Sequence, residues 1–209
     1  SPRGRLRISA PLLFSQTAMG KLAAEFAMKF PEVRLEITTE DRTVDMVEEA
    51  YDLVIRVNPA PDESLVGRAF LHDRLVVVAP PAFARPLDRS PVPAVVRGGA
   101  DRATAWHLRT DTGKASLAVD PILHLASLPM VRDAVLAGVG AARLPISLVS
   151  QDLAAGRLAH WGDIDAPEIA LWTLYPSRRL LSARVSAFLE HLRQAFPKGT
   201  PDELAAYVA

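Results

Sequence analysis

Short stretches of alternating apolar and polar residues open the chain and predict β-strands. Residues 6–9 and 33–37 alternate in this way, and residues 53–57 are apolar except at one position, patterns that are typical of strands. Between the first two stretches the apolar residues recur at helical spacing, at Met19, Leu22, Ala23, Phe26 and Phe30, and Pro31 follows them. This spacing predicts an amphipathic helix that stops at the proline.

A second, shorter helix is expected between the second and third strands. Thr43 is suited to cap it, Asp45 in its first turn would oppose the helix dipole, and it would run to about Ala50. The resulting order of strand, helix, strand, helix and strand implies parallel strands with right-handed crossovers. Residues 75–79 are all apolar and Pro80 follows them, which predicts a strand buried on both faces.

The composition changes after residue 80, where Pro, Arg, Asp and Gly become frequent until about residue 120. We interpret this change as the start of a second lobe. Further strands are expected at residues 94–96, 114–119, 122–126, 141–144 and 169–175. Helices are expected at residues 128–137 after Ser127, at residues 146–153, and after Ser182, with one more helical turn at residues 202–207.

Composition limits the classes of protein that need to be considered. The 209 residues are 49% hydrophobic and 23% charged, which is ordinary for a soluble globular protein with two modest lobes or one large one. Cysteine is absent, which excludes disulfides, thiolate metal sites and a cysteine nucleophile. No apolar run approaches the ~20 residues that a membrane helix needs. The net charge is zero, so direct contact with DNA is not expected from this chain.

The residues that usually carry chemistry form no familiar constellation. The five histidines include no pair at metal-ligand spacing. His191 is expected on the polar side of the last long helix, and His124 is expected in the core or in a cleft. No nucleophile elbow or phosphate-binding loop is present. Gly138 and Gly140 follow a helix and precede a strand, the reverse of a dinucleotide-binding motif, so a helix cap and turn is favoured. We therefore expect that the chain is not an enzyme and that it binds no metal and no cofactor.

The geometry of parallel sheets suggests where a ligand would bind. Such sheets bind ligands beyond the carboxyl ends of their strands, where the N-termini of helices offer free N–H groups to anions. Here those places are residues 9–14, 39–43 and 127–128, with Arg42 and Arg97 adding positive charge, although an exposed surface position is the alternative for each arginine. The residues expected to bind a small molecule are Ser9, Pro11, Phe14, Thr39, Asp41, Arg42, Val57, Arg97, Ser127 and Ala141.

Six segments, in order along the chain, resemble the effector-binding domain of LysR-type transcriptional regulators. They are residues 4–11 (GRLRISAP), 26–36 (FAMKFPEVRLE), 41–56 (DRTVDMVEEAYDLVIR), 137–145 (AGVGAARLP), 153–158 (LAAGRL) and 174–179 (LYPSRR). The chain departs from the family at Ala126-Ser127, where members often have Asn-Asp, at Arg143, where an apolar residue is common, and over residues 86–120.

The resemblance implies an α/β fold of two Rossmann-like lobes, the type 2 periplasmic-binding-protein fold. Lobe I would take residues 1–80 and 173–209, and lobe II residues 81–172. The intact cytoplasmic regulator would touch DNA only through an N-terminal winged helix-turn-helix that this sequence lacks; the missing initiator Met fits a processed protein or a fragment. Homodimers, or tetramers at full length, would pair through Lys21, Leu22, Glu25, Met28, Lys29, Val131, Arg132 and Val135.

Two other functions share this architecture. A periplasmic solute-binding protein of a transport system is the main alternative, and an enzyme on the same scaffold is disfavoured by the lack of a catalytic constellation. In the favoured hypothesis the effector is a small molecule, with an anion indicated by Arg42, and its binding shifts the population of conformations. Replacing Arg42 by alanine is then expected to weaken the binding of an anionic effector.

Overall fold

The computed structural model describes residues 1–99 and 101–209 and divides the chain into two units. Unit 1 comprises Ser1–His72 and Ile169–Ala209, and unit 2 comprises Asp73–Glu168. We expected the boundaries after residues 80 and 172. The difference arises because the apolar strand at residues 75–79 is hydrogen-bonded to two strands of unit 2.

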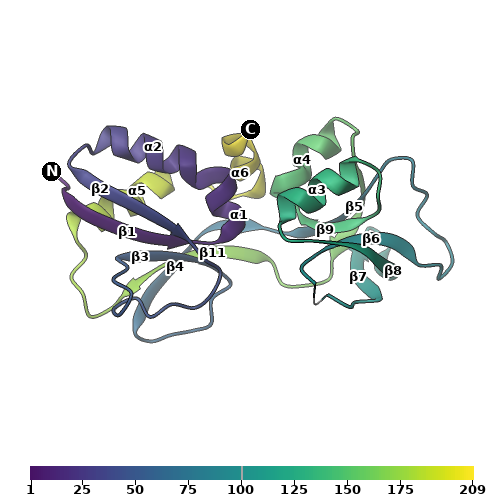
Figure 1. Ribbon diagram of the computed structural model, residues 1–209, viewed down its shortest axis with the longest axis horizontal. Helices are drawn as coiled ribbons and strands as arrows, with labels where there is room; N and C mark the ends of the chain where they lie inside the picture. Colours follow the sequence, from purple (N-terminus) through teal and green to yellow (C-terminus); the bar gives the residue numbers. More distant parts are fainter. Residues whose placement is uncertain (100) are drawn as a thin grey trace. The chain divides into compact units, whose positions relative to one another are not determined.

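Unit 1 is built on a five-stranded sheet in the order β2-β1-β3-β11-β4 (Figure 1). Strands β1 (Gly4–Ala10), β2 (Val33–Thr39) and β3 (Leu53–Val57) are parallel, as their sequence patterns predicted. Strand β11 (Ile169–Pro176) is antiparallel to β3. Strand β4 (Leu65–Asp73), which the sequence analysis missed, forms one edge of the sheet.

Helices cover one face of this sheet and enclose the main core of unit 1. The chain winds without a break through α1 (Leu12–Phe14), the π-helical turn η1 (Ser15–Met19) and α2 (Gly20–Lys29). Helix α5 (Ala183–Ala195) is capped by Ser182 as expected, and α6 (Pro201–Val208) packs beside η1. Leu6, Ile8, Leu53 and Ile55 of the sheet meet Phe26 and Phe188 of the helices in this core.

The expected solvated position of His191 is wrong. Its imidazole is buried against Phe26 and Phe188, and its Nε2 lies 2.9 Å from the carbonyl oxygen of Leu22. Because α2 packs on α5, the side of α5 that looks polar in sequence faces another helix. His124 also differs from expectation, since it is exposed and its Nδ1 lies 3.0 Å from the carbonyl oxygen of Gly98.

The segment of residues 40–52 covers the opposite face of the sheet, and the helix expected there does not form. The chain makes one turn at residues 46–50, where the Asp45 carboxylate accepts hydrogen bonds from the backbone N–H groups of Val47 and Glu48. Asp45, rather than Thr43, therefore caps this turn. Ala50 has a φ of 58°, which ends the turn and returns the chain to β3.

Unit 2 is built on a six-stranded sheet in the order β6-β8-β7-β10-β5-β9. Strand β5 (Leu75–Ala79) is buried on both faces as expected, with Val77 in one core and Val76 in the other. The two strands expected at residues 114–119 and 122–126 are one long strand, β8 (Gly113–Leu125). The remaining strands are β6 (Val92–Arg97), β7 (Ala105–Thr110), β9 (Ala142–Pro145) and β10 (Ala159–Ile164); β7 and β10 were not expected.

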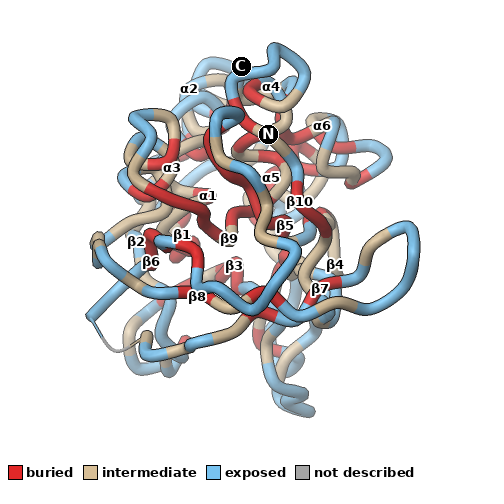
Figure 2. The backbone as a smooth tube through the Cα atoms, turned by 90° about the vertical axis from the view of Figure 1, so that its right-hand side faces the viewer, coloured by how far each residue is buried: buried red, intermediate tan, exposed pale blue. Residues whose placement is uncertain are grey.

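Two helices pack on one side of this sheet, at the positions that the sequence predicted. Helix α3 (Leu128–Leu136) begins after Ser127, whose hydroxyl accepts a hydrogen bond from the N–H of Met130, and α4 is Ile146–Ala154. Trp106 and Trp161 lie in the core on the other side. In both units the buried residues lie mainly in strands and helices, and the loops are mostly exposed (Figure 2).

Candidate functional site

The carboxyl ends of the three parallel strands of unit 1 bring together several of the residues expected to bind a ligand. Ser9 and Thr39 lie near the ends of β1 and β2, where Ser9 is paired in register with Thr38, and Val57 ends β3. Asp41 follows β2, and its carboxylate accepts a hydrogen bond of 3.1 Å from the backbone N–H of Leu12 in the first turn of α1. That carboxylate therefore already satisfies one of the N–H groups that could bind an anion.

Three of the expected ligand-binding side chains of unit 1 are enclosed in this structure, and Ser9 among them is 0% exposed. Phe14 is 4% exposed and packs in the core against Phe70 and Phe196, with ring centroids 5.8 and 6.3 Å away. Pro11 is buried at the start of α1. These residues shape the turn from β1 into the helix.

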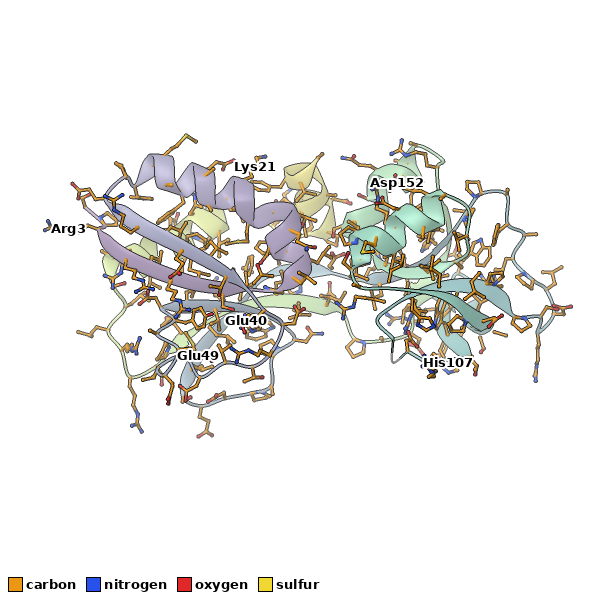
Figure 3. The ribbon with its side chains drawn as sticks, viewed as in Figure 1. Arg3, Lys21, Glu40, Glu49, His107 and Asp152 are labelled. Carbon is orange, nitrogen blue, oxygen red and sulfur yellow. The ribbon has the colours of Figure 1, made fainter. Side chains whose placement is uncertain are left out.

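Arg42 lies on the exposed surface of the segment of residues 40–52, between two carboxylates. It forms ion pairs with Glu40 and Glu49, both of which come from the same segment (Glu40 and Glu49 are labelled in Figure 3). Its hydrogen bond to Glu49 and the charges of both glutamates raise the pKa of the Arg42 guanidinium. Its positive charge is therefore largely neutralised within the segment.

Beneath this segment lies a charged residue that the sequence analysis missed. Arg56, near the end of β3, is only 7% exposed. Its Nη2 donates a hydrogen bond of 2.8 Å to Ser9 Oγ, and its Nε donates one of 3.0 Å to the carbonyl oxygen of Arg42. A single arginine within an otherwise apolar strand was the signal in the sequence that could have identified it.

Tyr51 completes this buried polar group. Its hydroxyl donates a hydrogen bond of 2.9 Å to Glu40 Oε1 and lies 2.7 Å from Thr38 Oγ1. The guanidinium of Arg7 lies over its ring, 4.4 Å from the centroid. The phenol thus connects the end of β2 to the segment that covers the sheet.

In unit 2 the expected ligand-binding residues lie at separate positions along the sheet and its loops. Arg97 is exposed at the end of β6, opposite Leu125 of β8, and Ser127 follows shortly after β8. Ala141 is fully buried, and its backbone is hydrogen-bonded to Pro93 and Val95. Arg97 and Ser127 therefore remain accessible candidates, whereas Ala141 belongs to the core.

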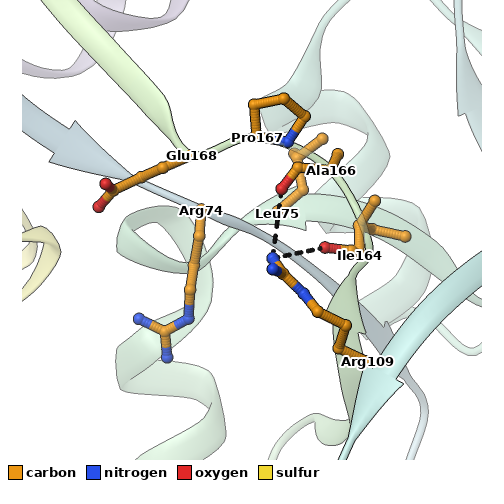
Figure 4. A pocket seen from close by; sticks show the side chains of 7 residues that line it. All are labelled: Arg74, Leu75, Arg109, Ile164, Ala166, Pro167 and Glu168. Atoms are coloured by element: carbon orange, nitrogen blue, oxygen red, sulfur yellow. Dashed lines mark hydrogen bonds between the residues drawn. The ribbon is translucent and has the colours of Figure 1, made fainter. Parts of the chain in front are cut away.

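Unit 2 also contains a pocket of about 190 Å³, lined by Arg74, Leu75, Arg109, Ile164, Ala166, Pro167 and Glu168 (Figure 4). The Arg109 guanidinium donates hydrogen bonds of 3.3 and 3.2 Å to the carbonyl oxygens of Ile164 and Ala166. Arg74 pairs with Asp163 at 3.3 Å. Both guanidinium groups thus have oxygen partners within unit 2.

The residues expected at a dimer interface divide into buried and exposed groups. Leu22, Val131 and Val135 are buried in the cores of their own units. Arg132 is half-buried and pairs with Asp152 at 2.8 Å. The side chains of Lys21, Glu25, Met28 and Lys29 lie on α2, where Met28 is 77% exposed; Lys21 Nζ donates a hydrogen bond of 3.0 Å to the carbonyl oxygen of Tyr207 in α6.

Among residues 1–99 and 101–209, no three His, Asp or Glu side chains are grouped so that they could hold a metal ion. Within the same residues, no helix has both the length and the apolar character that crossing a membrane requires.

Comparison with known proteins identifies the family. The model of the LysR substrate binding domain matches residues 1–197. The regulator PtxR of Pseudomonas aeruginosa is 29% identical over 204 residues, which cover 92% of this chain and 64% of PtxR. The regulator DmlR of Escherichia coli is 28% identical over 209 residues, covering 96% of this chain and 68% of DmlR. The chain thus spans about two thirds of the length of these relatives.

Solved structures show the same fold. The regulatory domain of CrgA from Neisseria meningitidis has a TM-score of 0.75 at 20% identity and covers 93% of this chain and 100% of that one. The regulatory domain of AphB from Vibrio vulnificus has a TM-score of 0.71 at 21% identity. The aligned residues cover 92% of this chain and 98% of the AphB domain. These likenesses confirm the type 2 periplasmic-binding-protein fold, and the relatives favour an effector-sensing regulatory domain over a transport protein. The chain therefore belongs to the LysR substrate-binding domain family.

Proposed function

We propose that this chain senses a small-molecule effector for a LysR-type transcriptional regulator and passes the signal to a DNA-binding domain elsewhere in the same protein. The observation that carries the proposal is the family match over residues 1–197. The relatives PtxR and DmlR are named as helix-turn-helix transcriptional regulators, and both are longer than this chain. The net charge of zero supports a chain that senses a ligand and leaves contact with DNA phosphates to another domain.

In this proposal the candidate ligand-binding residues of unit 1 lie at the carboxyl ends of β1, β2 and β3. Thr39, Asp41 and Arg42 are exposed there, at the edge of the sheet and on a segment hydrogen-bonded to it, whereas Ser9 is buried beside them. Polar groups at this edge of a parallel sheet are well placed to orient a ligand. In unit 2, Arg97 and Ser127 are the corresponding candidates.

A thermal-shift screen of small organic acids and aromatic compounds tests the proposal. A ligand that prefers the native state raises the melting temperature, by an amount that grows with its concentration relative to its Kd. We expect at least one compound to do so and Thr39→Ala to weaken its binding in titration calorimetry. Arg42→Ala should weaken the binding of an anionic compound further. An unchanged affinity would mean that Arg42 is not part of the site.

The control is Leu180→Ala, which alters a side chain exposed in a loop and placed in no site. This variant should bind the compound as the wild type does. A screen in which no compound stabilises the wild-type chain would contradict the proposed function.

A further inference from the structure

The pocket of unit 2 shares no residue with the candidate effector site, and its lining is accessible to solvent. The side chains of Arg74 and Arg109 are 47% and 55% exposed, and Leu75, Ile164 and Ala166 are half-buried. The volume of about 190 Å³ is below the about 300–1,000 Å³ of pockets that hold drug-sized ligands. The pocket therefore suits a molecule of one or two rings.

The walls of the pocket are fixed by the sheet of unit 2. Leu75 is the first residue of β5, and Arg109 lies in β7. The segment of residues 165–168, which follows β10, is tied to β7 because the Asp165 N–H donates a hydrogen bond of 2.9 Å to the carbonyl oxygen of His107. Little ordering of the protein is therefore needed for a ligand to bind.

The Arg109 guanidinium is held by its edge. Its Nη2 donates hydrogen bonds of 3.3 and 3.2 Å to the carbonyl oxygens of Ile164 and Ala166, and it lies among the other lining residues in Figure 4. Because the N–H donors of a guanidinium lie in its plane, these hydrogen bonds do not occupy its planar faces. Such a face can stack on an aromatic ring.

Both guanidinium groups of the pocket already have carboxylate partners. Arg74 pairs with Asp163 at 3.3 Å. Arg109 Nε lies 3.7 Å from Asp165, whose carboxylate also pairs with Lys114 at 3.3 Å. An anionic ligand would have to compete with these carboxylates, whereas an uncharged ligand leaves the ion pairs in place. The charges therefore favour an uncharged occupant.

We propose that this pocket is a second ligand site, which takes a small uncharged aromatic molecule with its ring stacked on the Arg109 guanidinium. The π face of a ring attracts a cation that lies over it. Leu75, Ile164 and Pro167 supply apolar contacts for the ring. The lining includes residues 74–75 and 166–168, from the two ends of unit 2. A bound ring would thus link the segments by which the chain enters and leaves this unit.

The test compares benzamide with cyclohexanecarboxamide, two uncharged amides that differ in whether the ring is aromatic. Each is titrated into the ¹⁵N-labelled chain, and the backbone amide signals of residues 164–166 and 168 are followed by NMR. We expect benzamide to shift these signals and to bind about two- to fivefold more tightly, the range for a ring over a cation at an exposed site. The saturated ring is the more hydrophobic of the two, so burial alone would reverse this preference.

Arg109→Met keeps a long side chain but removes the guanidinium. It should abolish the preference for benzamide and leave the affinity for cyclohexanecarboxamide nearly unchanged, whereas a purely structural role would weaken both compounds alike. Arg85→Met is the matched control. Arg85 also donates to a backbone carbonyl of unit 2, that of Trp161 at 2.6 Å, but it does not line the pocket. This variant should bind both compounds as the wild type does.

If Arg109→Met does not fold, Ala166→Phe replaces it. Ala166 lines the pocket, so a larger side chain there should fill it and abolish the binding of both compounds. The inference is contradicted by retained binding in Ala166→Phe, by equal wild-type affinities for the two compounds, or by benzamide leaving the signals of residues 164–168 unmoved. Each of these results leaves the proposed effector sensing intact, because the two sites share no residue.

Discussion

At Gly140 the chain that leads into β9 approaches the backbone of β6 so closely that no side chain fits. A Cβ atom there would lie 2.4 Å from the carbonyl oxygen of Pro93. Two hydrogen bonds of 2.8 Å, from Val95 N–H to the Ala141 carbonyl and from Ala141 N–H to the Pro93 carbonyl, hold the two strands together. The glycine therefore allows β6 to meet the chain that leads into β9.

Gly140→Ala is expected to destabilise the chain by about 3 kcal/mol, because the methyl group must displace backbone atoms. Gly138→Ala is the control, since Gly138 has a φ of +97° but open space around it. The control should cost about 1 kcal/mol from backbone strain alone. Urea unfolding of both variants measures the difference, and equal losses would show that the contact at Gly140 is easily relieved.

Asp73 is a buried carboxyl group that the sequence did not single out. It is 4% exposed and accepts hydrogen bonds from the Arg74 N–H at 2.9 Å, from the Ser147 N–H at 3.2 Å and from the Ser147 hydroxyl. Burial raises its pKa, and these hydrogen bonds only partly offset that effect. The group thereby caps the start of α4.

The raised pKa of Asp73 predicts a pH-dependent stability. In the native state the carboxyl binds its proton more tightly than in the unfolded state, whose pKa is about 3.9. Its contribution to stability is therefore greatest below that value and declines as pH rises through the native pKa. Urea unfolding between pH 4 and 7 should show the stability of the wild type falling relative to Asp73→Asn as pH rises. A difference that is independent of pH would contradict this prediction.

The sequence could identify the edge of the sheet where polar groups gather, but not which side chains are buried there. Ser9 and Thr39 were expected because parallel strands end together. Arg56 was missed and Phe14 was placed in the ligand site, because burial depends on what covers a residue. The helix that covers His191 is distant from it in sequence, and the segment that covers Arg56 folds back over the strand that follows it.

At the scale of elements, two of the strands that were missed, β4 and β10, have identifiable irregularities. Strand β10 contains a bulge between His160 and Gly162, where Gly162 has a φ of 145°. In β4, Gly67 interrupts the pattern, and a Cβ there would lie 2.8 Å from Leu174. The helix expected after Thr43 does not form, because Met46 and Tyr51 both pack with Val54 on one face of the sheet. Their spacing of five residues fits a turn better than one side of a helix.

Helices α3 and α4 are joined by the buried carboxylate of Asp152. It receives hydrogen bonds from Arg132 of α3 and from Arg157 beyond the end of α4. Burial alone would raise the pKa of Asp152, but the hydrogen bonds and charges of the two arginines outweigh it and lower that pKa. The ionised carboxylate is therefore part of the packing between these helices.

Asp152→Asn is expected to lower the free energy of unfolding by about 2–4 kcal/mol, since it leaves two guanidinium groups without their anion. Glu190→Gln is the matched control, because Glu190 pairs with Arg193 on the exposed surface of α5, where such pairs contribute about 0–1 kcal/mol. Thermal and urea unfolding measure both. Similar small losses of unfolding free energy in the two variants would mean that solvent reaches Asp152 and screens its charge.

At the scale of the whole molecule, the order of elements along the chain predicted parallel strands with crossovers, and the family resemblance implied the type 2 periplasmic-binding-protein fold. The family match ends at residue 197, and α6 lies beyond it. This helix contributes Leu204 to the core of unit 1, and its Tyr207 ring lies 4.0 Å from Lys21 Nζ. Burial and the nearby charge of Glu25 raise the pKa of the Tyr207 phenol. Helix α6 therefore occupies part of the α2 surface that was expected to meet a second copy of the chain.

Self-association should depend on the part of that surface which α6 leaves open. Met28 on α2 is 77% exposed and Met130 on α3 is 46% exposed, and these two helices carry the residues that the family resemblance places at the faces of a homodimer. We expect the wild-type chain to form dimers in light scattering coupled to size exclusion. Met28→Glu and Met130→Glu should each shift it toward monomers, because an apolar interface would have to bury an unpaired carboxylate. Leu180→Glu, at an exposed leucine outside both faces, should leave the dimer intact. Dimers that persist in both methionine variants would locate the contact elsewhere on the chain.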